Sequence, residues 1–407
     1  MKSFCRRLWR NKRGNSLLIA AGAMPMVVGA AGLASDTIQW ALWKRQLQRA
    51  ADSASIAGVY AKLANEDVTT QVSSDVTKNN KTGINLYSGP TIGYPANGQN
   101  YDNAVSVQLQ VQRSLSFSSM FMTAAPIITA NSTAAAVGTG DYCVVSLENT
   151  ATTGITAGGN TNVNLGCGMI TDSTSMTAAV AFGSSSVTAS PIAAVGGLSA
   201  SSNWAASTTL LPFTIAEADP FALVAAPTIP ASCNGSINDS PHAKTSPVAG
   251  CYTSMNVKGD MTLSGTYIIT GNVDVNAGAK LSCTSCTIIL TNTNPSSTGS
   301  VTINGGAQLN LAAQTTGPYA GIMFYQNRGA TSGGTNKING NSSSTFQGAV
   351  YFPSQNVEFT GTSGVTYNCI ELVSRTVTFL GNSSITNNCP ANSGAGAFKG
   401  HHIRLVA

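Results

Sequence analysis

The sequence GNSLLIAAGAMPMVVGAAGLASDTIQWALW, residues 14–43, organises the rest of the chain. No charged residue falls between Arg13 and Asp36, and most side chains in this interval are apolar. A helix rises about 1.5 Å per residue, so the interval is long enough to cross a hydrocarbon core about 30 Å thick. We therefore expect a membrane span from Gly14 to Ser35, with the lipid bilayer as the first partner of the chain.

The charges on the two sides of this span predict its orientation. Because the more basic flank of a single span stays in the cytoplasm, we expect residues 1–13 to form a basic cytoplasmic tail and the bulk of the chain to be exported. Trp9, Trp40 and Trp43 lie near the two ends of the span, where aromatic rings prefer the headgroup layer. The basic residues of the tail are Lys2, Arg6, Arg7, Arg10, Lys12 and Arg13.

The helical pattern continues beyond the span, so we expect one element over residues 14–66. Residues 37–64 contain no proline. Small residues every four positions let two helices approach closely, which predicts a seam that packs against copies of this helix or related helices. Two alternatives remain open: a signal anchor followed by an amphipathic stalk, and a signal peptide cleaved after Ala34. The seam residues are Ala50, Ala54, Ala57 and Gly58.

The composition of the exported part excludes one class of partner. Charged residues make up 9% of the 407 residues. Without the six basic residues of the tail, the chain contains 15 basic and 16 acidic residues. A nearly neutral ectodomain offers no basic surface for nucleic acid, so we expect none as a partner. Abundant Gly, Ser, Thr and Asn favour a sheet-rich fold with tight turns.

Residues 67–140 are predicted to form a small α+β segment. The chain from residue 65 to residue 93 is polar and reads as a loop. Residues 104–111 then alternate apolar and polar side chains, which is typical of a half-buried strand. We expect a short helix over residues 116–124 and a returning strand over residues 127–137.

Residues 141–400 are predicted to form a right-handed parallel β-helix-like solenoid, so the chain is mainly β overall. Short β-branched runs end repeatedly in glycine, and Gly340, Gly361 and Gly381 are 21 and 20 residues apart. Such a period indicates stacked coils. An antiparallel sandwich is the structural alternative. Prolines at about residues 211–230 mark a crossing between two blocks of the solenoid.

Eight of the nine cysteines lie beyond the span. An even number in an exported chain predicts disulfides. Eight cysteines allow 105 pairings, of which we favour pairing between sequence neighbours: Cys143–Cys167, Cys233–Cys251, Cys283–Cys286 and Cys369–Cys389.

The sequence predicts no catalytic, cofactor-binding or metal-binding residues. A glycan hydrolase needs two carboxylates close together, and Glu217 and Asp219 lie in the proline-rich crossing. Glu358 and Glu371 could meet across adjacent coils beside Arg375, but we interpret them as an outward ion pair. The pair His401–His402 reads as a solvated tail. Cys283 and Cys286 have no second Cys/His pair nearby that would complete a zinc site.

The N-terminal motif resembles a known family. Arg13-Gly14-Asn15, Pro25, Gly29, Gly32 and Asp36 are followed by Leu47-Gln48-x-Ala50-Ala51-Asp52-x-Ala54-x-x-Ala57-Gly58. This order resembles TadG-like proteins of the TadE/TadF/TadG group, which belong to the tight-adherence (Flp) pilus system of bacteria. Position five after Gly14 holds Ile19 in place of the Glu of a prepilin-peptidase site, so no processing is expected there.

The resemblance implies a single-pass protein of the bacterial inner membrane. It would act as a minor pilin-like or assembly component through helix packing and surface adhesion, not catalysis. Its partners would be other pilin-like or Tad assembly proteins, together with surface or matrix ligands. The alternative function is a membrane-tethered β-helix that binds or cleaves surface polysaccharide.

Overall fold

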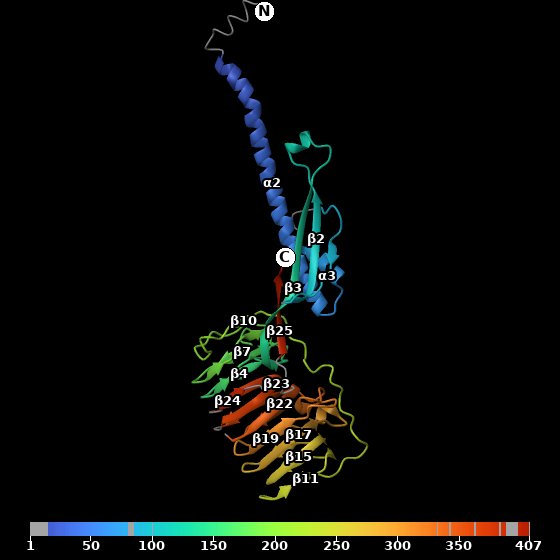
Figure 1. The fold of residues 1–407 in the computed structure, drawn as a ribbon, viewed down its shortest axis with the longest axis vertical. Coiled ribbons are helices and arrows are strands. Elements are labelled where there is room, and N and C mark those ends of the chain that lie inside the picture. The colour runs from blue at the N-terminus through green and yellow to red at the C-terminus, as the bar shows by residue number, and fades with distance from the viewer. Residues whose placement is uncertain are drawn as a thin grey trace, which may run out of the picture. The chain divides into compact units, whose positions relative to one another are not determined.

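The computed structural model describes residues 15–79, 85–99, 101–331, 333–341, 343–361, 364–381, 384–387 and 398–406. Among them are one long helix, a second short helix and many strands (Figure 1). The chain divides into two compact units. The first holds the described residues up to Val137 together with those from Ile403, and the second runs from Gly138 to His402.

The first unit is built on α2, which spans Asn15–Leu63 and continues through Pro25. Within the described residues, this is the one helix long and apolar enough to cross a membrane. Its first half leaves large apolar side chains such as Met26 and Val27 exposed, whereas Ala51, Ala54 and Val59 in its second half are buried. The two halves of one helix therefore meet different surroundings.

A second helix, α3 (Val68–Asn79), occupies the segment that we expected to be a loop. That prediction was wrong. Val68, Val72 and Val76 are all buried, and four-residue spacing places them on one face of a helix. The Asp67 carboxylate accepts a hydrogen bond from Thr70 N (2.7 Å), which caps the helix start.

An antiparallel sheet completes the first unit. It contains β1 (Thr91–Gly93), β2 (Tyr101–Gln112) and the first part of β3 (Ile127–Ser146). The sheet confirms both strands expected here. The short helix expected over residues 116–124 is reduced to one 3₁₀ turn, η1 (Ser118–Met120).

The second unit consists of short strands that pair in parallel (Figure 1). The antiparallel sandwich is thereby excluded for this unit. The strands are β4 (Ile155–Ala157), β5 (Asn162–Asn164), β6 (Gly168–Thr171), β7 (Ala179–Ala181), β8 (Ser186–Thr188), β9 (Ile192–Ala194), β10 (Leu210–Pro212), β11 (Ile237–Asn238), β12 (Lys244–Thr245), β13 (Gly250–Tyr252), β14 (Met255–Val257), β15 (Asp260–Ile269), β16 (Val273–Val275), β17 (Lys280–Leu290), β18 (Val301–Ile303), β19 (Gln308–Ala313), β20 (Ile322–Gln326), β21 (Thr335–Ile338), β22 (Thr345–Gly361), β23 (Gly364–Gly381) and β24 (Ser384–Asn387), with a 3₁₀ turn η2 (Pro295–Ser297). The last strand, β25 (Phe398–Leu405), begins in the second unit and ends in the first.

These pairings arrange the strands in columns. One column runs β11–β14–β16–β18–β21–β22–β23–β4–β7. Apolar side chains of successive strands, such as Val257, Val275 and Ile303, stack on one another and are fully buried. Phe359 and Phe379 add stacked rings 5.4 Å apart. The core of the unit therefore runs along the stack, between the columns.

The order of the stack departs from the order of the sequence. The early strands β3, β4 and β5 pair with the late strands β23 and β24, not with β11. A long connection, residues 213–236, leads from β10 at one end of the stack to β11 at the other (Figure 1). We call it the crossing segment. It contains most of the proline-rich stretch that the sequence marked as a crossing.

The C-terminal histidines were predicted wrongly. His401 and His402 lie inside β25 and are half-buried, so they do not belong to a solvated tail.

Candidate functional site

The small-residue seam of α2 faces the interior of the first unit. Ala54 is fully buried. A Cβ on Gly58 would lie 2.8 Å from Val105 Cγ1 and 3.1 Å from Val72 Cγ2. Small residues let neighbouring backbones approach closely, and here they let α2 pack closely against α3 and β2. Contact of this seam with a helix of another protein stays a prediction. Ala50 and Ala57 are only partly covered, so they are the seam residues that could make such a contact.

Polar contacts fix the same half of α2 to β3. Gln48 Nε2 donates to the backbone oxygen of Asn131 (2.7 Å), and the hydroxyls of Ser55 and Ser132 lie 3.0 Å apart. Lys44 Nζ donates to the backbone oxygen of Thr129. The second half of α2 is therefore integral to the unit rather than a free stalk.

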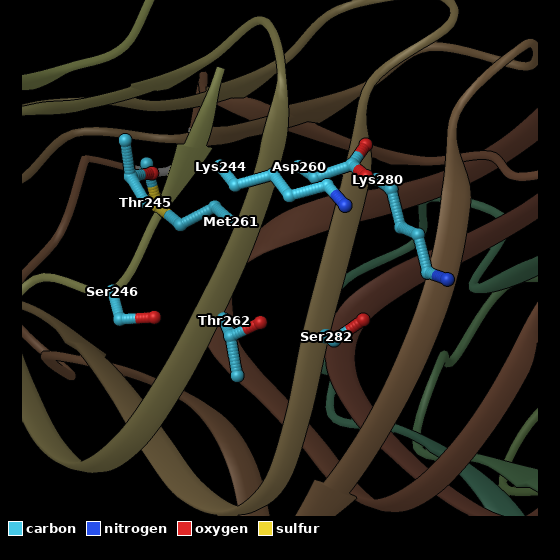
Figure 2. A pocket seen from close by; sticks show the side chains of 8 residues that line it. All are labelled: Lys244, Thr245, Ser246, Asp260, Met261, Thr262, Lys280 and Ser282. Carbon is cyan, nitrogen blue, oxygen red and sulfur yellow. The ribbon is translucent and has the colours of Figure 1, made fainter. Parts of the chain in front are cut away.

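A polar groove crosses the outer face of β12, β15 and β17. Its volume is about 230 Å³, and its lining side chains are shown in Figure 2: Lys244, Thr245, Ser246, Asp260, Met261, Thr262, Lys280 and Ser282. Parallel register places Lys244, Asp260 and Lys280 in one row across the three strands. A second row holds hydroxyl groups. The groove offers hydrogen-bond donors and acceptors to a polar ligand, but it has one carboxylate and so lacks the pair that a glycan hydrolase needs.

Two interacting carboxyl groups, those of Asp172 and Glu217, lie at the start of the crossing segment. Glu217 N donates to Asp172 Oδ1 (2.7 Å). Burial raises the pKa of Asp172 to about 7, and burial together with the Asp172 charge raises the pKa of Glu217 to about 7. Sequence reasoning paired Glu217 with Asp219 and missed Asp172, which is 45 residues away in the chain and gives no local signal.

Asp219 instead joins a second cluster under the crossing segment. Its Oδ2 accepts from Tyr351 OH (2.6 Å) and lies 3.5 Å from Arg328 Nε. Arg328 also donates to the backbone oxygens of Phe221 and Val224. These contacts attach the crossing segment to the stack, so this cluster has a structural role.

The proposed trio of Glu358, Glu371 and Arg375 is not assembled as an outward ion pair. Arg375 Nη2 lies 2.8 Å from Oε2 of Glu148, a nearly fully buried residue that sequence reasoning did not single out. Glu371 is itself buried, and this burial raises its pKa to about 8. A carboxyl with that pKa is protonated at neutral pH and makes no ion pair.

Three disulfides join cysteines that are neighbours in the sequence: Cys143–Cys167, Cys233–Cys251 and Cys283–Cys286. The last of these joins the two cysteines that were considered above as part of a zinc site. The proposed pair Cys369–Cys389 lies outside the side chains that the structure describes. Among the described residues, no group of three or more His, Cys, Asp or Glu side chains could hold a metal ion.

Comparison with known proteins adds one finding to this geometry. Residues 14–61 match the Tad family model, which is described as Flp pilus-assembly TadE/G-like. No curated protein and no solved structure matches the chain. The matched range begins with the apolar run and ends two residues before the end of α2, so it corresponds to this one helix. The long N-terminal helix is similar to the TadE/G-like Flp pilus-assembly model, and the resemblance to TadG-like proteins is confirmed over these residues.

Proposed function

We propose that this protein is a membrane-anchored structural component of a bacterial tight-adherence (Flp) pilus, either a minor pilin-like subunit or an assembly protein. The single observation that carries the proposal is the coincidence of the TadE/G-like match with the exposed apolar half of α2. A helix with large apolar side chains on its outside is stable in lipid and costly in water. The protein would lie in the inner membrane, with residues 1–13 in the cytoplasm.

The second unit would serve as an inert display surface. We propose that its parallel columns are the faces of a right-handed β-helix, since parallel crossover connections are right-handed in nearly all proteins. Its outward side chains are mostly Thr, Ser and Asn, which suit contact with surface or matrix ligands. Adhesion and assembly by packing, without catalysis, would follow from such a surface.

Recovery of the protein from cells tests this proposal. Sheared filaments and washed membranes are fractionated, and the intact mass and the N-terminal residue of the protein are measured in each. The proposal expects the protein in one or both fractions with residues 14–35 still attached. Protein found only in the medium and beginning at Ser35 would overturn it.

A substitution tests the helix-packing part of the proposal. Ala57→Leu adds bulk at a partly covered seam position. Ile56→Leu changes the adjacent residue without changing its size, and it serves as the control. We expect filament number to fall for Ala57→Leu alone, with both variants equally resistant to protease. Normal filaments in Ala57→Leu would argue against packing through this seam.

The carboxyl pair Asp172–Glu217 favours a second candidate function, the cleavage of a surface polysaccharide. Two carboxyls with pKa values of about 7 could share the acid and base roles of a hydrolase. Release of reducing ends from envelope glycans by the purified protein, lost in Glu217→Gln, would support this function over the structural one.

A further inference from the structure

The tip of the β2–β3 hairpin carries an unusual apolar surface. The tip connects Gln112 to Ile127. Three consecutive side chains in it, Met120, Phe121 and Met122, are 76%, 74% and 48% exposed. No charged residue lies between Arg113 and Asp141. Contiguous exposed apolar side chains in a chain so rich in polar residues mark an interaction surface.

A buried carboxylate fastens this tip to α2. Asp36 is 3% exposed. It accepts hydrogen bonds from Phe117 N at 3.0 Å, Ser118 N at 2.5 Å and Ser118 Oγ at 2.6 Å. Hydrogen bonds to a charged acceptor are about twice as strong as neutral ones. The tip is therefore held at one defined position along the helix.

A glycine one turn earlier on the helix makes room for the tip. A Cβ placed on Gly32 would lie 2.3 Å from Cδ2 of Phe117, so the Phe117 ring rests directly on the helix backbone. Phe117 also contacts Phe121, with ring centroids 5.4 Å apart. The exposed cluster is thereby connected to the helix through packed rings as well as through Asp36.

The place where the tip is attached to α2 determines how deep the tip lies in the membrane that α2 would cross. The uncharged interval from Gly14 to Ser35 spans about 33 Å as a helix, close to the thickness of a hydrocarbon core. Gly32 and Asp36 therefore lie where the core gives way to the headgroup layer, which is about 6 Å deep on each side. Nearby, the Arg113 guanidinium lies 4.3 Å from the centre of the Trp43 ring. Trp43 is about 10 Å further along the helix than Asp36, so this pair lies on the water side of the layer.

We propose that Met120, Phe121 and Met122 insert into the interfacial layer of the membrane that α2 crosses, as a second lipid contact of the first unit. The inference rests on the proposed membrane anchoring. Its partner is phospholipid at the boundary between headgroups and acyl chains. Two contacts at one membrane surface hold the hairpin against the bilayer and restrict rotation of the exported part about the helix axis.

Photo-crosslinking of the full-length protein in bacterial membranes tests the proposal. A photoreactive benzoylphenylalanine replaces Phe121 in one variant and Tyr94 in the control. Tyr94 is also exposed, at 57%, but its ring lies beside Lys62, about 39 Å further along the helix than Asp36. We expect a phospholipid adduct, detected by mass, at position 121 and none at position 94.

The outcomes separate this inference from the proposed function. Protein absent from the membrane fraction overturns both. Protein in the membrane whose position 121 links to another polypeptide, or to nothing, overturns the lipid contact and leaves the anchor. With Asp36→Ala added, which removes every acceptor that holds Phe117 and Ser118, we expect the lipid adduct at position 121 to fall to the level of the control, while the protein stays in the membrane. An undiminished adduct in that variant would show that Asp36 does not position the tip.

Discussion

The carboxyl pair at the start of the crossing segment makes the stability of the second unit depend on pH, and Asp172→Asn should remove a large part of that dependence. Asp172 and Glu217 are joined by the hydrogen bond from Glu217 N to Asp172 Oδ1. An asparagine amide oxygen can accept the same hydrogen bond. The substitution therefore removes the ionisable group and keeps the contact.

The direction in which the free energy of unfolding changes with pH follows from the raised pKa of Asp172. Burial raises the pKa of Asp172 from 3.8 to about 7, so the folded protein holds a proton that the unfolded chain releases. The stabilisation from this proton is complete below about pH 3.8 and is lost as the pH rises to about 7. Each pH unit in that interval is worth about 1.36 kcal/mol, which gives about 3 kcal/mol between pH 5 and pH 8. Glu217 is more exposed and should add less.

Urea unfolding of the detergent-solubilised protein, followed by circular dichroism, measures this effect. We expect the free energy of unfolding of the wild type to fall by about 3 kcal/mol from pH 5 to pH 8. The decline in Asp172→Asn should be much smaller, and the variant should be the more stable protein at pH 8. The exposed carboxylate in Asp260→Asn provides the control. A wild type and an Asp172→Asn variant with parallel pH profiles would refute the reasoning.

Three further predictions concern single contacts. Gly58→Val should destabilise the first unit by about 1–3 kcal/mol, because its side chain would overlap Val105; thermal unfolding of the purified protein measures this, and an unchanged midpoint would count against the packing described. Cys251→Ser removes the disulfide that closes an 18-residue separation and should cost about 3 kcal/mol, seen as a urea midpoint below that of the oxidised wild type; an unchanged midpoint would contradict this. Arg328→Ala should cost about 1–3 kcal/mol through its lost hydrogen bonds and expose the crossing segment to protease near Asp219; equal cleavage of both proteins would contradict the role assigned to this arginine.

The features predicted correctly from sequence are those with a local periodic cause. The uncharged run before Asp36 predicts a long apolar helix because hydropathy and length are properties of adjacent residues. The alternation over residues 104–111 predicts β2 for the same reason. Glycine-terminated β-branched runs predict short strands, and these are what the second unit contains.

The features missed depend on contacts distant in sequence or on a weak local signal. The segment that forms α3 is mostly polar. Its three valines favour a helix only once α2 is known to provide a surface that buries them. Asp172 and Glu217 are brought together by the return of the chain along the stack, which no spacing reveals. The hydrogen bonds from Phe117 and Ser118 to Asp36 link residues 81 and 82 positions apart, so the motif residue Asp36 is recognisable from sequence while its partner is not.

The order of the stack gives the crossing segment its importance. Because the early strands pair with β23 and β24, the two ends of the stack are formed by strands near β10 and β11, and the crossing segment connects them. Strands at the ends of such a stack expose unpaired edges, which invite association with other chains. The segment is held at three levels: by Asp172 near one end, by Arg328 and Tyr351 in the middle, and by the Cys233–Cys251 disulfide at the other end. A connection fastened in this way restrains the strands at both ends of the stack, so loosening it at any of the three places would free the strand edges where the second unit is most open to self-association.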